Sequence, residues 1–138
     1  MEVLINHLGD VQFEVRARNH AVYCDQPVEA GGYDEGMTPP EFFLASLGAC
    51  AGYYAAQYAN ANGLTAKGMR VRVTAEKAKA PARLDDLRIF VEYPETLDPR
   101  HREGLWQSVH KCLIHNTLTH PPKITTEIVA AEPIAQAA

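Results

Sequence analysis

The strongest constraint on the fold of this chain is the uncharged apolar run FFLASLGACAGYYAA at residues 42–56. A run of this kind must be buried, and its length suits about four turns of helix. It is shorter than the roughly 20 apolar residues that span a bilayer, and the polar residues Gln57 and Asn60 follow it. We therefore expect a buried helix over residues 39–62, with Thr38 as its N-cap and two prolines in its first turn.

Strand patterns rich in β-branched and aromatic residues lie on both sides of this helix. They predict strands at residues 2–8, 11–24, 67–80, 84–94 and 123–133. A second helix is expected over 98–112, where Asp98 precedes a proline, and a short helical turn over 113–118. The order of elements predicts one α+β domain over residues 1–138, with antiparallel sheets around a long central helix. No glycine-rich phosphate loop is present in the sequence.

Charge and cysteine content narrow the classes of function. The formal net charge is -4 and the lysines and arginines are scattered, which argues against a nucleic-acid partner and against an anionic membrane surface. The N-terminal residues do not resemble a secretory signal, so a cytoplasmic location is expected. Three cysteines without CxxC spacing predict no permanent disulfide framework, and any cross-link would be transient.

Cys50 lies in the middle of the apolar run. A helical period places it on one face with Phe43, Leu47, Tyr54 and Tyr58, and this face is expected to meet the core. One interpretation is that Cys50 only fills space, since free cysteine is among the most buried residue types. A reactive thiolate would need a nearby cation, because burial raises the pKa of a thiol and the helix start lies about three turns away.

A second thiol, Cys112, lies in the segment HKCLIHNTLTHPP beside three histidines, His110, His115 and His120. Cysteine and histidine are the usual zinc ligands, so a metal module built on these residues is one hypothesis. The spacing HxCx2Hx4H matches no common zinc pattern, and no metal is expected.

Together, TPPEFFLASLGAC at residues 38–50 and CLIHNTL at residues 112–118 resemble the OsmC/Ohr family of thiol-dependent hydroperoxide reductases. Members of that family carry one cysteine inside a long central helix and a second one in a short C-x-x-x-N segment after a later helix. The resemblance covers most of the chain and implies the OsmC-like fold, built as an intertwined homodimer with a site at the subunit interface.

The resemblance also implies a reaction. Cys50 would attack an organic hydroperoxide and become a sulfenic acid, and Cys112 would condense with it to a disulfide. An external dithiol would then reduce the pair, with no cofactor. The aromatic residues Phe42, Phe43 and Tyr54 would bind the substrate and favour alkyl or aryl peroxides over hydrogen peroxide.

Family members use an arginine and a glutamate to hold the thiolate and orient the peroxide. Arg18 is the best match for the arginine, and Glu41 is assigned to the glutamate. Alignment on the family's NPE pattern puts Pro40 at the glutamate position, so Glu41 comes one residue late, a rotation of about 100°. Glu41 and Cys50 would lie about 13 Å apart along one helix, so Glu41 would act from another subunit or from an unwound first turn, or would serve only the helix terminus.

Two further side chains are expected to serve packing, Cys24 at a strand end and Trp106 as an anchor of the second helix. The alternative function is a protein with little or no turnover that binds a small apolar ligand in the interface cleft.

Overall fold

The N-terminal part of the protein is a three-stranded antiparallel sheet. The computed structural model describes residues 1–130. Within them β1 (Leu4–Gly9), β2 (Gln12–Ala17) and β3 (His20–Cys24) follow each other in the order β1-β2-β3. The expected strand over 11–24 is therefore a hairpin, because Arg18 adopts a left-handed conformation (φ 54°) and turns the chain. A single 3-10 turn, Val28–Ala30, follows in the loop.

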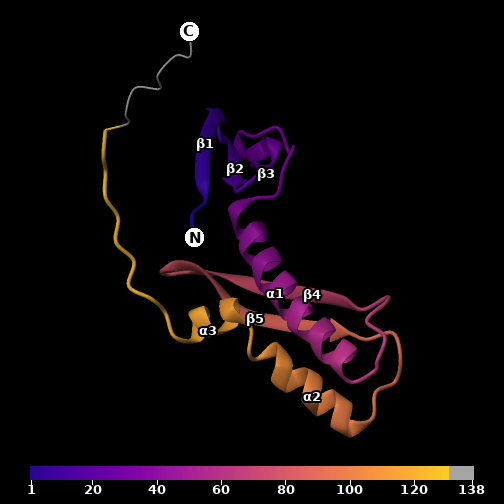
Figure 1. The fold of residues 1–138 in the computed structure, drawn as a ribbon. Coiled ribbons are helices and arrows are strands. Elements are labelled where there is room, and N and C mark those ends of the chain that lie inside the picture. The colour runs from indigo at the N-terminus through magenta and orange to yellow at the C-terminus, as the bar shows by residue number, and fades with distance from the viewer. Residues whose placement is uncertain (131–138) are drawn as a thin grey trace.

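The long helix is confirmed. Helix α1 spans Pro39–Ala61 with Thr38 as its N-cap and prolines in its first turn, as predicted. It crosses an antiparallel pair, β4 (Arg70–Lys79) and β5 (Ala82–Glu92), and α2 (Pro99–Val109) lies beside it (Figure 1). A short helix, α3 (Leu113–Thr119), contacts α1. The α+β fold class with antiparallel sheets and a long central helix is thus as expected.

The buried face of α1 matches the predicted one only in part: Leu47 is buried and Tyr58 packs against the core, as expected. The residues that face the core are small ones, Ala51, Ala55 and Ala59, together with Leu47 and Gly48, whereas Cys50 and Tyr54 are only half-buried. The helix is apolar on every side, so periodicity alone could not select its inner face. Close packing on β4 selects the small residues: a Cβ on Gly48 would lie 3.0 Å from Val73 Cγ2.

The core lies between α1, α2 and the inner face of the β4–β5 pair. Leu105 and Val109 of α2 complete it with Ala51 and Ala55, and side chains of both strands pack against this cluster. The N-terminal sheet adds no residue to it and lies at the start of α1, away from β4 and β5 (Figure 1). Several of its apolar side chains are exposed: Leu4, Ile5, Leu8, Val22 and Tyr23.

Two predictions, one about packing and one about a strand, are wrong. Trp106 is 58% exposed on α2, where Leu105 and Val109 make the core contacts instead. The strand expected from residue 123 is absent through residue 130, where the chain is extended, exposed and unpaired; residues 131–133 of that prediction lie outside the described part. No helix within residues 1–130 is long and apolar enough to cross a membrane.

Candidate functional site

The two cysteines of the hypothesis lie together. Cys50 is half-buried on α1, and Cys112 is fully buried at the N-cap of α3, the helix that packs on α1. The Cys112 thiol lies near enough to the Cys50 thiol to raise its own pKa through it, and both thiols are free. The structure therefore brings near each other two side chains that are 62 positions apart in a sequence of 138 residues.

Cys112 is placed by the tight connection between α2 and α3. Its peptide N–H donates to the carbonyl of Val109 at 3.1 Å, so the chain turns as α2 ends. Its sulfur accepts the peptide N–H of His115 at 3.4 Å and so caps α3. This geometry fixes the sulfur at the base of α3, on the side that faces α1.

The environment of Cys112 favours its neutral form. Burial raises the pKa of this thiol above its usual value, and the neighbouring Cys50 thiol raises it further, while the amides of His115 and Ile114 oppose the shift. A buried thiol with a raised pKa is protonated at neutral pH. The pair therefore presents one half-buried sulfur, that of Cys50, next to a protonated one.

Cys24 is remote from this pair and is buried at the end of β3. Its pKa is raised, first by burial and then by the adjacent carboxylate of Asp25. Both effects suppress the thiolate, which agrees with the packing role expected for Cys24.

Arg18 is exposed at the turn between β2 and β3, in the sheet at the start of α1. Cys50 lies about three turns further along the helix. Within one chain the structure does not bring this guanidinium to the thiols.

Glu41 has a structural partner of its own. Its Oε2 accepts the Thr38 N–H at 2.7 Å and the Thr38 hydroxyl at 2.8 Å, which forms a capping box at the start of α1. These two hydrogen bonds lower the pKa of the Glu41 carboxyl. Glu41 is exposed and, as its spacing implied, does not contact Cys50 within the chain.

The three aromatic residues expected to bind substrate are half-buried along α1: Phe42, Phe43 and Tyr54. Tyr54 packs edge-on against Tyr53, with ring centroids 5.3 Å apart, and Tyr53 is 57% exposed. These rings form an apolar surface on the parts of α1 that the core does not cover. On the same helix, Tyr54 follows Cys50 by about one turn and Phe43 precedes it by about two turns.

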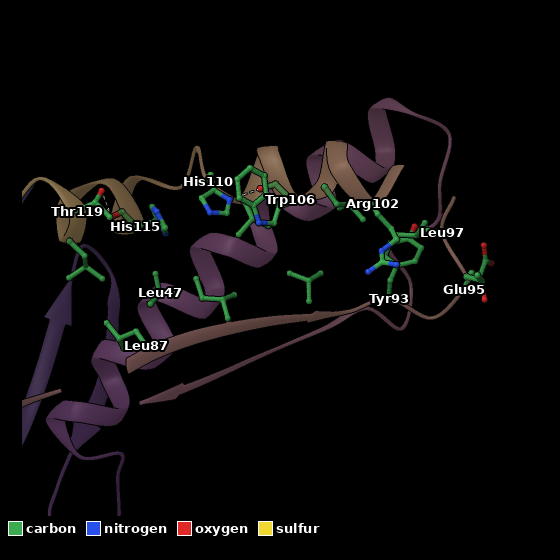
Figure 2. Close-up of a pocket in the computed structure, with 16 residues that line it drawn as sticks. Leu47, Leu87, Tyr93, Glu95, Leu97, Arg102, Trp106, His110, His115 and Thr119 are labelled. Atoms are coloured by element: carbon green, nitrogen blue, oxygen red, sulfur yellow. Dashed lines mark hydrogen bonds between the residues drawn. The ribbon is translucent and has the colours of Figure 1, made fainter. Parts of the chain in front are cut away.

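Sequence reasoning missed a cavity of about 750 Å³ on the inner face of β5. Its floor is Leu87, Ile89, Val91 and Tyr93, and α2 and α3 overhang it (Figure 2). Trp106, His110 and His115 project into it from above, with ring centroids 3.9 Å apart for the first pair and 4.9 Å for the second. The i, i+4 spacing of Trp106 and His110 was the available signal, since it puts both on one helical face.

We find no metal-type cluster among residues 1–130, in the sense of three or more convergent His, Cys, Asp or Glu side chains. His110 is held by the carbonyl of Trp106, which its Nδ1 approaches at 2.7 Å, and His120 lies beside the carbonyl of Asn116. The histidines near Cys112 thus have other partners.

The family model and the similar solved structures point to the same protein family. A family model described as OsmC-like protein matches residues 32–127. No curated protein matches the chain. Among solved structures, the chain is similar to a putative osmotic stress induced and detoxification response protein from Psychrobacter arcticus, with 20% identity, a TM-score of 0.76 and coverage of 83% of this chain and 85% of that one.

Two further structures are similar at lower scores. An OsmC-like protein from Mycoplasma pneumoniae shares 19% identity with a TM-score of 0.69, and 87% of each chain is covered. An organic hydroperoxide resistance protein OsmC from Legionella pneumophila, also described as a predicted redox protein, shares 18% identity with a TM-score of 0.60 over 86% of this chain and 89% of that one. At these identities the structures show a common fold.

Proposed function

Because this chain belongs to the OsmC-like protein family, we propose that it is a cysteine-based peroxidase that reduces organic hydroperoxides. The observation that carries the proposal is the proximity of the Cys50 and Cys112 thiols, on two helices that pack together. A redox and stress-related role fits the family, and the relative from Legionella pneumophila is described as a hydroperoxide resistance protein. The proposed location is the cytoplasm, where thiols such as these stay reduced.

The proposed reaction has three steps. The Cys50 thiolate takes the terminal oxygen of ROOH, the O–O bond breaks, and the leaving alkoxide takes up a proton to give ROH and a sulfenic acid. The Cys112 thiol then attacks the Cys50 sulfur, and the hydroxyl leaves with the Cys112 proton as water. An external dithiol reduces the resulting disulfide by exchange and is itself oxidised to a disulfide.

The roles of the two sulfurs follow from their surroundings. Cys50 is half-buried and can meet a substrate, whereas Cys112 is fully buried and can meet only its neighbour. The raised pKa of Cys112 keeps it protonated until the Cys50 sulfur becomes electrophilic. Attack by Cys50 and resolution by Cys112 is therefore the assignment that accessibility favours.

The proposed active unit is a homodimer. A thiolate at Cys50 needs a cation, and Arg18 cannot provide one within its own chain, so we assign Arg18 of a second copy to this role. Glu41 would act the same way, at the cost of its bonds to Thr38. The half-buried aromatic residues of α1, Phe42, Phe43 and Tyr54, would then bind the organic part of the peroxide.

The alternative is a protein that binds a small apolar ligand with little turnover. The cavity beside β5 favours it, because about 750 Å³ lies within the usual range for ligand pockets and the walls are largely apolar. A ligand-binding protein would keep its thiols unchanged in the presence of peroxide.

The test is treatment of the reduced protein with one equivalent of cumene hydroperoxide, followed by peptide mapping. A peroxidase forms the Cys50–Cys112 disulfide, and Cys112→Ser leaves a sulfenic acid on Cys50 that dimedone traps. Cys24→Ser is the matched control and should behave like the unmodified protein. A disulfide that involves Cys24, or no reaction at Cys50, would overturn the proposal.

A further inference from the structure

A connecting loop determines how the three-stranded sheet is attached to the rest of the chain. The strands of the sheet pack mainly on one another, and the core cluster takes no residue from them. The loop, residues 25–37, leads from Cys24 at the end of β3 to Thr38, the N-cap of α1 (Figure 1). Within the described part of the chain, the direction of the sheet relative to α1 therefore depends on how this loop is held.

A buried carboxylate holds the loop together. Asp25 is 0% exposed and is the only buried side chain of polar or charged type in the part of the chain that the structure describes. Its Oδ1 accepts the N–H of Gln26 at 2.8 Å, and its Oδ2 accepts the N–H groups of Tyr33 at 3.0 Å and Glu35 at 3.2 Å. The Gln12 side chain also donates to Oδ2, at 3.5 Å. A buried anion is costly without partners, and here neutral amides supply all four hydrogen bonds.

The same loop is fixed to the sheet at two further points. Gln12, the first residue of β2, donates to Oε2 of Glu35 at 2.9 Å, so β2 is tied to the loop directly as well as through Asp25. The loop also lies against β3, since a Cβ on Gly36 would be only 2.5 Å from the carbonyl oxygen of Tyr23. Loop and sheet thus form one unit at the end of the sheet that leads into α1.

Arg18 lies at the other end of this sheet. Strand β2 begins at Gln12, beside Asp25, and ends at Ala17, after which Arg18 turns the chain into β3. Six strand residues at about 3.3 Å each put the two ends about 20 Å apart. A tilt of about 10° at the loop would therefore move the guanidinium by about 3.5 Å, which is more than the length of a hydrogen bond. A small change at the loop is enough to misplace Arg18.

We propose that Asp25 is a positioning residue for Arg18, because its carboxylate holds the loop on the sheet and so fixes where the guanidinium lies relative to α1. The inference rests on the proposed function, in which Arg18 of a second copy supports the Cys50 thiolate. Asp25→Asn is the matched perturbation, since it keeps the size of the side chain. In either orientation its NH2 group faces an N–H donor that a carboxylate oxygen had accepted, so loop hydrogen bonds are lost.

The test is the rate at which iodoacetamide alkylates Cys50 at pH 7, read by peptide mapping of the full chain. Arg18→Ala should slow the reaction about tenfold, because a nearby cation favours the thiolate. Asp25→Asn should slow it by about threefold or more when Arg18 is present, and by less than about twofold when Arg18→Ala is combined with it. A purely structural role would slow both backgrounds equally, so dependence on Arg18 identifies positioning.

The matched control is Asp34→Asn, the same change at an exposed carboxylate of the same loop, which should leave the rate unchanged. An Asp25→Asn protein that reacts at the unmodified rate, or is slowed as much without Arg18 as with it, would overturn the proposal. If Arg18→Ala has no effect, the proposed role of Arg18 is wrong, and the positioning role of Asp25 falls with it.

A milder variant keeps the test decisive if Asp25→Asn loses its helix content by circular dichroism. Gln12→Ala removes only the side-chain bonds to Asp25 and Glu35. It should slow alkylation of Cys50 about twofold to threefold with Arg18 present and not at all without it, and equal rates in both backgrounds would refute positioning. Alkylation requires no peroxide turnover, so a protein that forms no disulfide with cumene hydroperoxide refutes the peroxidase proposal separately.

Discussion

Truncation of Leu47 tests the account of how α1 is held on the sheet. Its side chain is 2% exposed and lies on the face of α1 that meets the core, at the wall of the β5 cavity. Leu47→Ala removes about three carbon groups, worth roughly 2.5 kcal/mol of transfer free energy. The space left by the removed atoms adds a cavity term of about 24 cal/mol per Å³. This term is smaller here, because one side of Leu47 already borders the β5 cavity. We expect a loss of about 3 kcal/mol.

The assay is urea denaturation at a fixed protein concentration, since dimerisation would make stability concentration-dependent. The matched control is Leu113→Ala on α3, because Leu113 is 61% exposed and its loss should cost less than about 1 kcal/mol. Equal losses for the two variants, or a loss below about 1 kcal/mol for Leu47→Ala, would refute the assignment of the core-facing side of α1.

Three further outcomes are expected. Gly48→Val should destabilise the protein by about 1–3 kcal/mol and Gly48→Ala by less, because a Cβ at this position would lie 3.0 Å from Val73. Equal urea midpoints for the two variants and the unmodified protein would contradict this packing. Burial raises the pKa of the Asp25 carboxyl, but the amides of Gln26, Glu35 and Tyr33 and the Gln12 side chain outweigh it and lower the pKa overall. The stabilisation by the ionised Asp25 carboxylate is thus present above the unfolded pKa of about 3.9 and is lost as the pH falls through the lower folded value. In a series of urea denaturations at acidic pH, Asp25→Asn should therefore make the urea midpoint depend less steeply on pH. An unaltered pH dependence would contradict this role of Asp25. Steady-state kinetics should give a higher kcat/KM for cumene hydroperoxide than for hydrogen peroxide, and the reverse order would remove the role of the aromatic residues on α1.

Local signals made much of the fold predictable. Helix α1 begins and ends close to where the sequence predicts, because Thr38 and the prolines act on neighbouring backbone groups. The strands β4 and β5 were likewise marked by alternating residues. Because these features depend on a few adjacent residues, they can be predicted from a single sequence.

What failed depended on contacts between distant segments. The inner face of α1 is set by how closely Gly48 approaches β4, which no periodicity in an apolar helix reveals. Trp106 was expected to anchor α2 in the core, but it borders the cavity beside β5 and is largely exposed, because Leu105 and Val109 occupy the face of α2 that meets α1. The strand predicted from residue 123 has no partner strand within residues 1–130, and strands form only when paired.

The candidate site was predicted in part. The resemblance singled out Cys50 and Cys112, and the structure places the two thiols near each other. Glu41 illustrates the limit of pattern matching, since the same carboxylate completes a capping box with Thr38. Arg18 lies on a hairpin whose position relative to a second copy is not encoded in local sequence.

The most direct test of the redox proposal is a count of free thiols per chain under denaturing conditions, before and after one equivalent of organic hydroperoxide. The reduced protein has three cysteines, all free. If Cys50 and Cys112 form a disulfide, the count falls from three to one, and dithiothreitol restores it. A count that stays at three would contradict the central claim.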